Sequence, residues 1–135
     1  MKRLATNNHS VFKLCFHMIL VVKYRRKVLT SAITDRLKEI FLYIAPSYNI
    51  TLKEWNFEAD HIHILVDSQP NTSFSKFVNA YKSASSRLIK KEFSGIREQL
   101  WKEMFWSKSY CLLSVGGAPL EVLKKYIESQ KGSEE

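Results

Sequence analysis

The residues with the clearest chemical potential are two histidines, His61 and His63, in the segment "DHIHILVD". In a β-strand, residues two apart point to the same side, so these imidazoles project together with Cα atoms about 6.6 Å apart. Both can therefore reach one metal ion. Ile62, Ile64 and Val66 point to the other side, as expected for the buried face of a strand. A catalytic metal site also needs at least a third protein ligand and an open coordination position.

The last predicted helix, in the segment "APLEVLKKYIESQKG", offers that third ligand. Tyr126 and Gln130 lie four residues apart and are therefore neighbours on the flank of the helix's apolar stripe, which comprises Leu120, Leu123 and Ile127. Considered alone, Tyr126 is typical of an amphipathic packing residue, and Gln130 of a solvated helix end. The pair becomes a candidate site only together with the histidines.

A first strand is predicted over residues 11–23, because apolar residues alternate there with other types. Its buried face carries Phe12, Leu14, Phe16, Met18, Leu20 and Val22, and its opposite face carries Lys13, Cys15 and His17. In this register Lys13 and His17 share the face of His61 and His63. We therefore expect the histidine face to be polar and reachable by solvent.

The remaining elements are predicted from hydrophobic spacing and from turn residues. They are a helix over 30–46 capped by Thr30 or Ser31, a hairpin over 49–67 that turns near Ala59, a helix over 73–93, a strand over 104–115 and a helix over 118–131. Gly116 and Gly117 separate the last strand from the last helix, which Pro119 opens.

The resulting order is β-α-β-β-α-β-α. It predicts an α+β fold of the ferredoxin-like or RRM-like type, a split β-α-β antiparallel sheet with helices on one face. The third, C-terminal helix is additional to that arrangement. We treat residues 1–135 as one domain, with a core over 10–115 and the C-terminal helix over 118–131. Trp55, Trp101 and Trp106 are assigned to the core or to a dimer interface.

The charge of the chain indicates a polyanionic partner. There are 21 Lys and Arg residues against 13 Asp and Glu residues, a net charge of +8. No acidic residue precedes Asp35, and none lies between Asp67 and Glu92. Nucleic acid is the first candidate and an anionic membrane surface the second.

The predicted DNA contacts are Lys23, Tyr24, Arg25, Arg26 and Lys27, together with Lys76, Arg87 and Lys90 on the second helix. Tyr24 could stack on an unpaired base or pack on the body of the protein.

The cysteines and the first apolar segment indicate the cellular compartment in which the protein acts. Cys15 and Cys111 are far apart and lack CxxC spacing, so neither a disulfide framework nor a zinc knuckle is expected. The run "VFKLCFHMILVV" contains Lys13 and His17 and is too short to span a membrane, so it is interpreted as a core strand rather than a signal peptide. A reducing, cytoplasmic setting is expected, with no membrane partner.

The chain resembles the TnpA-type single-tyrosine transposases of the HUH endonuclease superfamily, in which U is a bulky apolar residue. The resemblance rests on "HMILVVKYRRKVL", "DHIHILV", "FWSKSYCLLSVGG" and "VLKKYIESQ", in the family's order and spacing over nearly the whole chain. HxH followed by YxxxQ beyond a Gly-rich hinge is a far more specific pattern than HxH alone.

The resemblance implies roles for the matching residues. His61, His63 and Gln130 would bind a divalent metal ion, Mg²⁺ or Mn²⁺ being the first candidates, and Tyr126 would attack a DNA phosphate. The family cuts and rejoins single-stranded DNA near hairpins at the ends of its mobile element, through a 5′-phosphotyrosine intermediate. The resemblance also implies a homodimer, in which the tyrosine helix of one subunit can complete the site of the other. Gly116 and Gly117, otherwise an ordinary turn, would then be a hinge.

Three other interpretations stay open at the level of sequence. RRM-like sheets also bind single strands without catalysis, although they use stacked aromatic residues on that face. A metal-dependent phosphodiesterase that uses water would not need Tyr126. A domesticated relative could bind and nick hairpins without mobilising an element.

Overall fold

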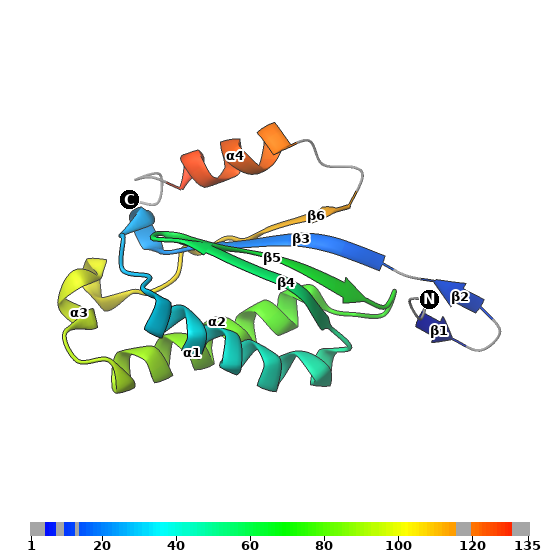
Figure 1. Ribbon diagram of the computed structural model, residues 1–135, viewed down its shortest axis with the longest axis horizontal. Helices are drawn as coiled ribbons and strands as arrows, with labels where there is room; N and C mark the ends of the chain where they lie inside the picture. The colour runs from blue at the N-terminus through cyan, green and yellow to red at the C-terminus, as the bar shows by residue number, and fades with distance from the viewer. Residues whose placement is uncertain (1–4, 8–9, 13, 116–119, 131–135) are drawn as a thin grey trace.

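The computed structural model describes residues 5–7, 10–12, 14–115 and 120–130. Its centre is a four-stranded antiparallel sheet in the order β4-β5-β3-β6 (Figure 1). The strands are β3 (Leu14–Val21), β4 (Thr51–Glu58), β5 (His61–Ser68) and β6 (Cys111–Ser114). The two strands that are central in space, β3 and β5, begin the two β-α-β halves of the chain. This is the predicted ferredoxin-like arrangement, and the predicted α+β fold class is confirmed.

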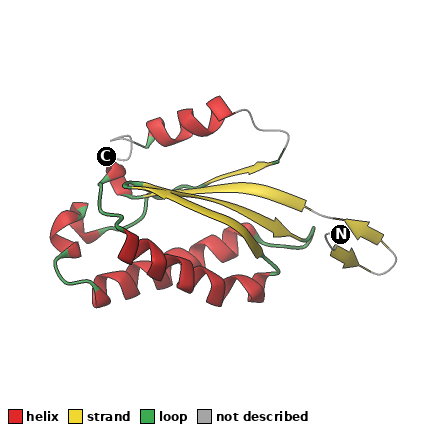
Figure 2. Ribbon diagram, viewed as in Figure 1, coloured by secondary structure: helices red, strands yellow, loops and turns green. Residues whose placement is uncertain are grey.

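Two long helices, α1 (Ser31–Ile44) and α2 (Phe74–Glu92), cover one face of the sheet (Figures 1 and 2). Of the two residues predicted as possible caps, Thr30 is the N-cap of α1, because its Oγ1 accepts the backbone N–H of Ile33 at 3.3 Å. Ile62, Ile64 and Val66 of β5 are fully buried beneath the helices. The period-2 prediction for this strand is therefore confirmed.

The C-terminal helix, α4 (Leu120–Ser129), lies across the opposite face of the sheet (Figure 1). There Ile19, Val21 and Cys111 form a second apolar cluster, against which Tyr126 and Ile127 pack. The expectation that the histidine face is polar and reachable by solvent is therefore met only in part. The histidines there are partly exposed, but Ile19 and Val21 on the same face have no exposed surface. The physical reason is that an amphipathic helix must bury its apolar stripe, and α1 and α2 already occupy the other face.

The N-terminal part of the chain also differs from the prediction. Val11 and Phe12, predicted as the start of one long strand, belong instead to a separate hairpin, β1 (Ala5–Asn7) paired with β2 (Ser10–Phe12). Lys13, placed by sequence on the histidine face, lies outside the described residues. So do Gly116, Gly117 and Pro119.

The predicted strand over 104–115 is shorter, because only β6 joins the sheet. Residues before it form an irregular segment in which Trp106 makes an isolated bridge to Val22, and Lys82 Nζ donates to the carbonyls of Ser107 and Ser109, both at 2.7 Å. These side-chain bonds take the place of ladder bonds for that backbone. Among the described helices, none combines the length and apolar character needed to cross a membrane.

The short elements are η1 (Lys23–Arg25), η2 (Ala45–Tyr48), α3 (Ile96–Gln99) and η3 (Trp101–Glu103). Trp106 belongs to the main apolar core and Trp55 packs against that core, whereas Trp101 packs beside η1. Trp106 is buried and donates its indole N–H to Ser85 at 2.9 Å, Trp55 packs edge-on against Phe41, and Trp101 packs against Tyr24.

Candidate active site

The two histidines occupy the first half of β5, on the face covered by α4. In the antiparallel register His61 lies opposite Val21, and His63 lies opposite Ile19 on β3. Both histidines are partly buried, with 14% of the His61 side chain exposed. The sheet thus holds the two imidazoles side by side on a rigid element, as their spacing predicts.

Asp60, in the turn before β5, holds the ring of His61. Its Oδ1 lies 2.8 Å from His61 Nδ1, and its Oδ2 accepts a hydrogen bond from Arg25 Nε at 2.8 Å. Burial raises the pKa of the Asp60 carboxyl, but the hydrogen bonds from His61 and Arg25 outweigh it and the net pKa is lowered. The ionised carboxylate fixes the His61 ring and leaves its Nε2 for a ligand.

Arg25 reaches Asp60 from η1, where Tyr24 and Arg25 have positive φ angles of 56° and 54°. Non-glycine residues in this region cost about 1–3 kcal/mol each, so the surrounding contacts must hold them. The sequence prediction missed Asp60. The available signal was an acidic residue directly before the HxH segment, in "ADHIH".

His63 is held from the neighbouring strand. His17 Nδ1 lies 3.0 Å from His63 Nε2, and the two ring centroids are 5.1 Å apart. Burial lowers the pKa of His63, and the nearby His17 and His61 lower it further. His63 is therefore kept neutral to lower pH than an ordinary histidine, and the neutral imidazole is the form that binds metal ions.

The donors suit a divalent ion, although they are incomplete as arranged. The described part of the chain contains no ready-made group of three His, Cys, Asp or Glu side chains for a metal. His61 has the carboxylate partner typical of metal-binding histidines, and an amide oxygen such as that of Gln130 could complete the set. In this arrangement Gln130 Oε1 instead accepts hydrogen bonds from Ser107 at 2.5 Å and Ser109 at 3.3 Å.

Tyr126 projects from α4 and is partly buried. Its hydroxyl lies 2.9 Å from Ser109 Oγ, while its ring packs with Ile19, Val21 and Cys111. Ser107 and Ser109 therefore hold both functional candidates of α4, Tyr126 and Gln130, against the segment that precedes β6. The sequence prediction assigned these serines no role, although they lie in the quoted segment "FWSKSYCLLSVGG".

The basic loop after β3 is less exposed than a surface charge run. Lys23 is buried, at 1% exposure, with Nζ 5.3 Å from the centre of the Tyr24 ring. Tyr24 packs edge-on against Trp101 with centroids 5.0 Å apart, so the structure places it on the body of the protein. Arg25 is paired with Asp60, which leaves Arg26 and Lys27 as the exposed cations of the loop.

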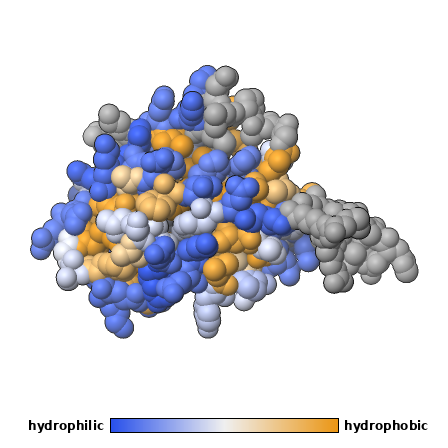
Figure 3. All heavy atoms as spheres, viewed as in Figure 1, coloured by the Kyte–Doolittle hydropathy of each residue, from blue (hydrophilic) through white to orange (hydrophobic). Residues whose placement is uncertain are grey.

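The cations predicted on α2 lie in the helical layer, on the side of the sheet away from the histidines. Lys76 and Arg87 are exposed and Lys90 is partly exposed. In the space-filling view, hydrophilic side chains cover much of the lower part of the molecule, where α1 and α2 lie, with apolar groups between them (Figure 3).

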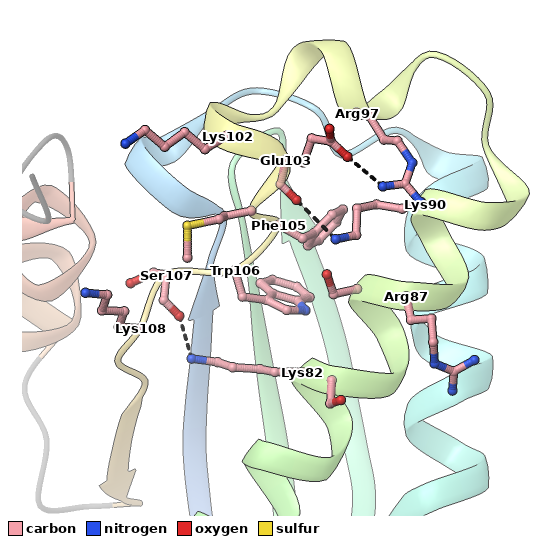
Figure 4. Close-up of a pocket in the computed structure, with 13 residues that line it drawn as sticks. Lys82, Arg87, Lys90, Arg97, Lys102, Glu103, Phe105, Trp106, Ser107 and Lys108 are labelled. Carbon is pink, nitrogen blue, oxygen red and sulfur yellow. Dashed lines mark hydrogen bonds and ion pairs between the residues drawn. The ribbon is translucent and has the colours of Figure 1, made fainter.

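Arg87 and Lys90 line an open cleft of about 740 Å³ between α2, η3 and the segment leading to β6 (Figure 4). Its lining holds six cations, which are Lys82, Arg87, Lys90, Arg97, Lys102 and Lys108. The one carboxylate in this lining, Glu103, is paired with Arg97 at 2.6 Å. Its end at Ser107 and Lys108 adjoins Ser109, the residue that contacts Tyr126.

Solved structures identify the class of protein that has this sheet, covered by two helices on one face and a tyrosine-bearing helix on the other. The fold matches a crystal structure of a putative transposase from Deinococcus radiodurans R1 with a TM-score of 0.84 and 31% identity, over 94% of this chain and 98% of that chain. It also matches the REP-associated tyrosine transposase bound to a REP hairpin, with a TM-score of 0.58 and 9% identity over 93% and 69% of the chains. The fold is that of a transposase.

Sequence comparison gives the family. The family described as "Transposase IS200 like" matches residues 10–130, and this chain belongs to it. The chain is 36% identical to the ISDra2 transposase TnpA of Deinococcus radiodurans over 92% of its length and 89% of that protein. It is 25% identical to the transposase for insertion sequence element IS200 of Salmonella typhimurium, over 94% of this chain and 86% of that protein. The protein is therefore a DNA transposase, and the TnpA-type resemblance is confirmed.

Proposed function

We propose that this transposase cleaves and rejoins single-stranded DNA at the ends of a mobile element, with Tyr126 as the nucleophile. The observation that carries the proposal is the arrangement of the histidine face. An ionised carboxylate orients His61, His63 stands beside it on β5, and the helix carrying Tyr126 and Gln130 packs on that same face. A metal-assisted transfer of a DNA phosphate to tyrosine would use His61, His63 and Gln130 as metal ligands and Tyr126 as the nucleophile.

The tyrosine chemistry conserves the energy of the phosphodiester bond. Tyr126 Oη attacks the phosphorus, the bond to the 3′-oxygen breaks, and that oxygen leaves as a 3′-hydroxyl once protonated. The strand on the 3′ side of the cut remains attached to Tyr126 through its new 5′-phosphate, as a 5′-phosphotyrosine. Attack by the same or another 3′-hydroxyl reverses the step and rejoins the strand, so no external energy source is required.

The phenol of an ordinary tyrosine has a pKa of about 10, so Tyr126 needs in-line placement and a positive environment. Mg²⁺ or Mn²⁺ held by His61, His63 and Gln130 would supply that positive charge by polarising the non-bridging phosphate oxygens. The imidazole of His61 is held for this purpose by Asp60. Gln130 must first exchange its bonds to Ser107 and Ser109.

We propose that α4 shifts to complete the site, within one subunit or between two, because Gln130 Oε1 is engaged by Ser107 and Ser109 in the present arrangement. We propose that the protein acts as a homodimer, and that Gly116 and Gly117 form the hinge that lets α4 reach the histidines of the same or the partner subunit. Support comes from the contacts of Tyr126 and Gln130 with Ser109, which are side-chain hydrogen bonds and can exchange. Cys15 and Cys111 are not joined in a disulfide, which is consistent with action in the reducing cytoplasm.

We further propose that the basic cleft binds the phosphate backbone of a DNA hairpin. Arg97 neutralises the one carboxylate there, Glu103, and the other five cations of the lining favour a polyanion. The REP-associated tyrosine transposase, a distant structural neighbour, was solved bound to a REP hairpin, which supports the choice of a hairpin as the probe. The proximity of the cleft to Ser109 and Tyr126 would bring the single strand beside the hairpin toward the nucleophile.

Covalent trapping tests the nucleophile. Purified protein mixed with single-stranded DNA from the element end, containing its hairpin, is expected to form a denaturation-resistant adduct with Mg²⁺ or Mn²⁺. Tyr126→Phe and His61→Ala should each abolish it, whereas Tyr43→Phe, on the exposed side of α1, should leave it unchanged.

Other outcomes favour the competing functions. An adduct that persists in Tyr126→Phe would contradict the nucleophile assignment. Cleavage without an adduct would indicate a phosphodiesterase that uses water, and binding without cleavage would indicate a nucleic-acid-binding module. Nicking of hairpin DNA without excision or reinsertion of a complete element would favour the domesticated relative.

A further inference from the structure

A third histidine on the same face has no role in the function proposed above. His17 lies in the middle of β3, where it is paired with Leu65 and is therefore diagonal to His63 on β5. Its Nδ1 is 3.0 Å from His63 Nε2, and the ring planes are inclined by 47°. One ring therefore donates an N–H to the lone pair of the other. The separation is that of a direct hydrogen bond between the two rings.

His61 and His63 are thus held in parallel ways. Asp60 engages Nδ1 of His61 and leaves Nε2, while His17 engages Nε2 of His63 and leaves Nδ1. Among the described residues, no other hydrogen bond to the His63 ring is present. Each candidate ligand therefore has one ring nitrogen fixed by a neighbour and one available, which is the arrangement usual for metal-binding histidines.

The surroundings make this contact specific. Ile19 and Val21, which follow His17 on the same face of β3, are fully buried and offer the His63 ring no polar partner. Without His17, the His63 ring would lose its polar anchor in a partly buried place. Both its rotation about χ2 and its choice of tautomer would then be free.

We propose that His17 is a positioning residue of the metal site, which fixes the ring orientation and tautomer of His63. The inference rests on the proposed metal-dependent function, because it assigns His63 as a ligand. It adds a second anchor, from a different strand, to the one that Asp60 provides. Loss of such a partner typically weakens metal affinity by about 10- to 100-fold.

Mn²⁺ binding by the full-length protein without DNA tests this directly, with free Mn²⁺ measured by electron paramagnetic resonance. His17→Ala is expected to weaken the affinity by about 10- to 100-fold. His17→Asn should restore part of it, because an asparagine amide can occupy roughly the place of the imidazole Nδ1. Cys15→Ser, two residues away on the same face of β3, is the matched control and should bind as wild type does.

A second readout separates positioning from general damage to the sheet. Long-range ¹⁵N correlation spectra of the metal-free protein should show a defined tautomer of His63 in wild type and an altered or averaged tautomer in His17→Ala. Thermal melting should show that His17→Ala and His17→Asn are both folded. A structural role alone would change the melting temperature of both variants without a difference in their Mn²⁺ affinity.

Different results would contradict the role of His17 and the metal site itself. Wild-type affinity in His17→Ala would overturn the inference, and tighter binding would show that His17 competes with the metal for His63 Nε2. If wild type bound no Mn²⁺, or if His61→Ala bound it as tightly as wild type, the proposed metal site itself would fail and the role of His17 with it.

Discussion

At the scale of single residues, Asp60 connects the basic loop after β3 to the histidine strand. It is 6% exposed and divides its two oxygens between Arg25 and His61. A buried carboxylate in that position serves two purposes. It orients a candidate ligand, and it compensates the charge of an arginine held in a strained backbone conformation.

The substitution Asp60→Asn tests the first purpose. An amide cannot accept hydrogen bonds from both partners through two charged oxygens, so Mn²⁺ affinity is expected to fall by about 10- to 100-fold. The unfolding free energy should also fall, by about 1–3 kcal/mol, because a hydrogen-bonded ion pair is lost.

Asp67→Asn, at the far end of β5, is the matched control for removal of one carboxylate. Isothermal titration and thermal melting measure the two effects separately. Unchanged metal affinity in a destabilised Asp60→Asn protein would restrict Asp60 to a structural role.

At the scale of elements, the position of α4 decides whether Tyr126 is held or free. Its described contacts with the sheet are the apolar cluster around Ile19 and Val21 and the polar contacts with Ser107 and Ser109. A single helix that packs on the outer face of the sheet should open locally more often than the whole protein unfolds.

Cys111 reports this opening, because it lies at 8% exposure in the cluster beneath α4. Burial also raises the pKa of its thiol, so less reactive thiolate is present at neutral pH and the reaction should accelerate as pH rises. In a Cys15→Ser background, Cys111 should therefore react slowly with a thiol reagent.

Ser109→Ala should speed that reaction about fivefold, the factor that corresponds to one lost hydrogen bond of about 1 kcal/mol. Ser83→Ala, on the exposed side of α2, is the control and should have no effect. Equal rates in the Ser109→Ala protein and its parent would show that the Tyr126 contact does not hold α4 in place.

At the scale of the whole molecule, the structure separates two kinds of surface. The histidine face lies on one side of the sheet, while the predicted cations of α2, which are Lys76, Arg87 and Lys90, lie in the helical layer on the other side. The cleft of Figure 4 runs from that layer to Ser107 and Lys108 near the end of β3. It is therefore the described surface that best connects DNA binding with the nucleophile.

Salt dependence tests the cleft. Arg87→Gln and Lys102→Gln should each weaken binding of the hairpin and reduce the slope of log affinity against log salt by about 1, since each removes one phosphate contact. Lys38→Gln, an exposed lysine on α1 outside the cleft, should reduce it less. Equal slopes for all three variants would indicate diffuse attraction to a basic protein rather than binding in the cleft.

The local patterns that allowed prediction are those with short-range causes. The alternation of Ile62, Ile64 and Val66 predicted both the strand and its buried face, and Thr30 was one of two candidates for a helix cap. The hairpin β1-β2 was missed because three-residue strands carry almost no periodic signal. The cleft was missed because its cations come from α2, η3 and the segment before β6, which are adjacent only in the fold.

The sequence by itself determined the fold class, the common face of His61 and His63, and the family to which the protein belongs. These follow from residue spacing and from motif order, which the chain carries in one dimension. Only the tertiary structure decided that Asp60 and His17 hold the two histidines, that Lys23 is buried, and that Ser107 and Ser109 hold the tyrosine helix against the sheet. The contacts of His17 with His63, of Arg25 with Asp60 and of the two serines with α4 depend on strand pairing or helix docking between segments distant in the chain. Asp60 directly precedes His61, but only the fold shows that its carboxylate holds that ring. No local periodicity encodes these contacts.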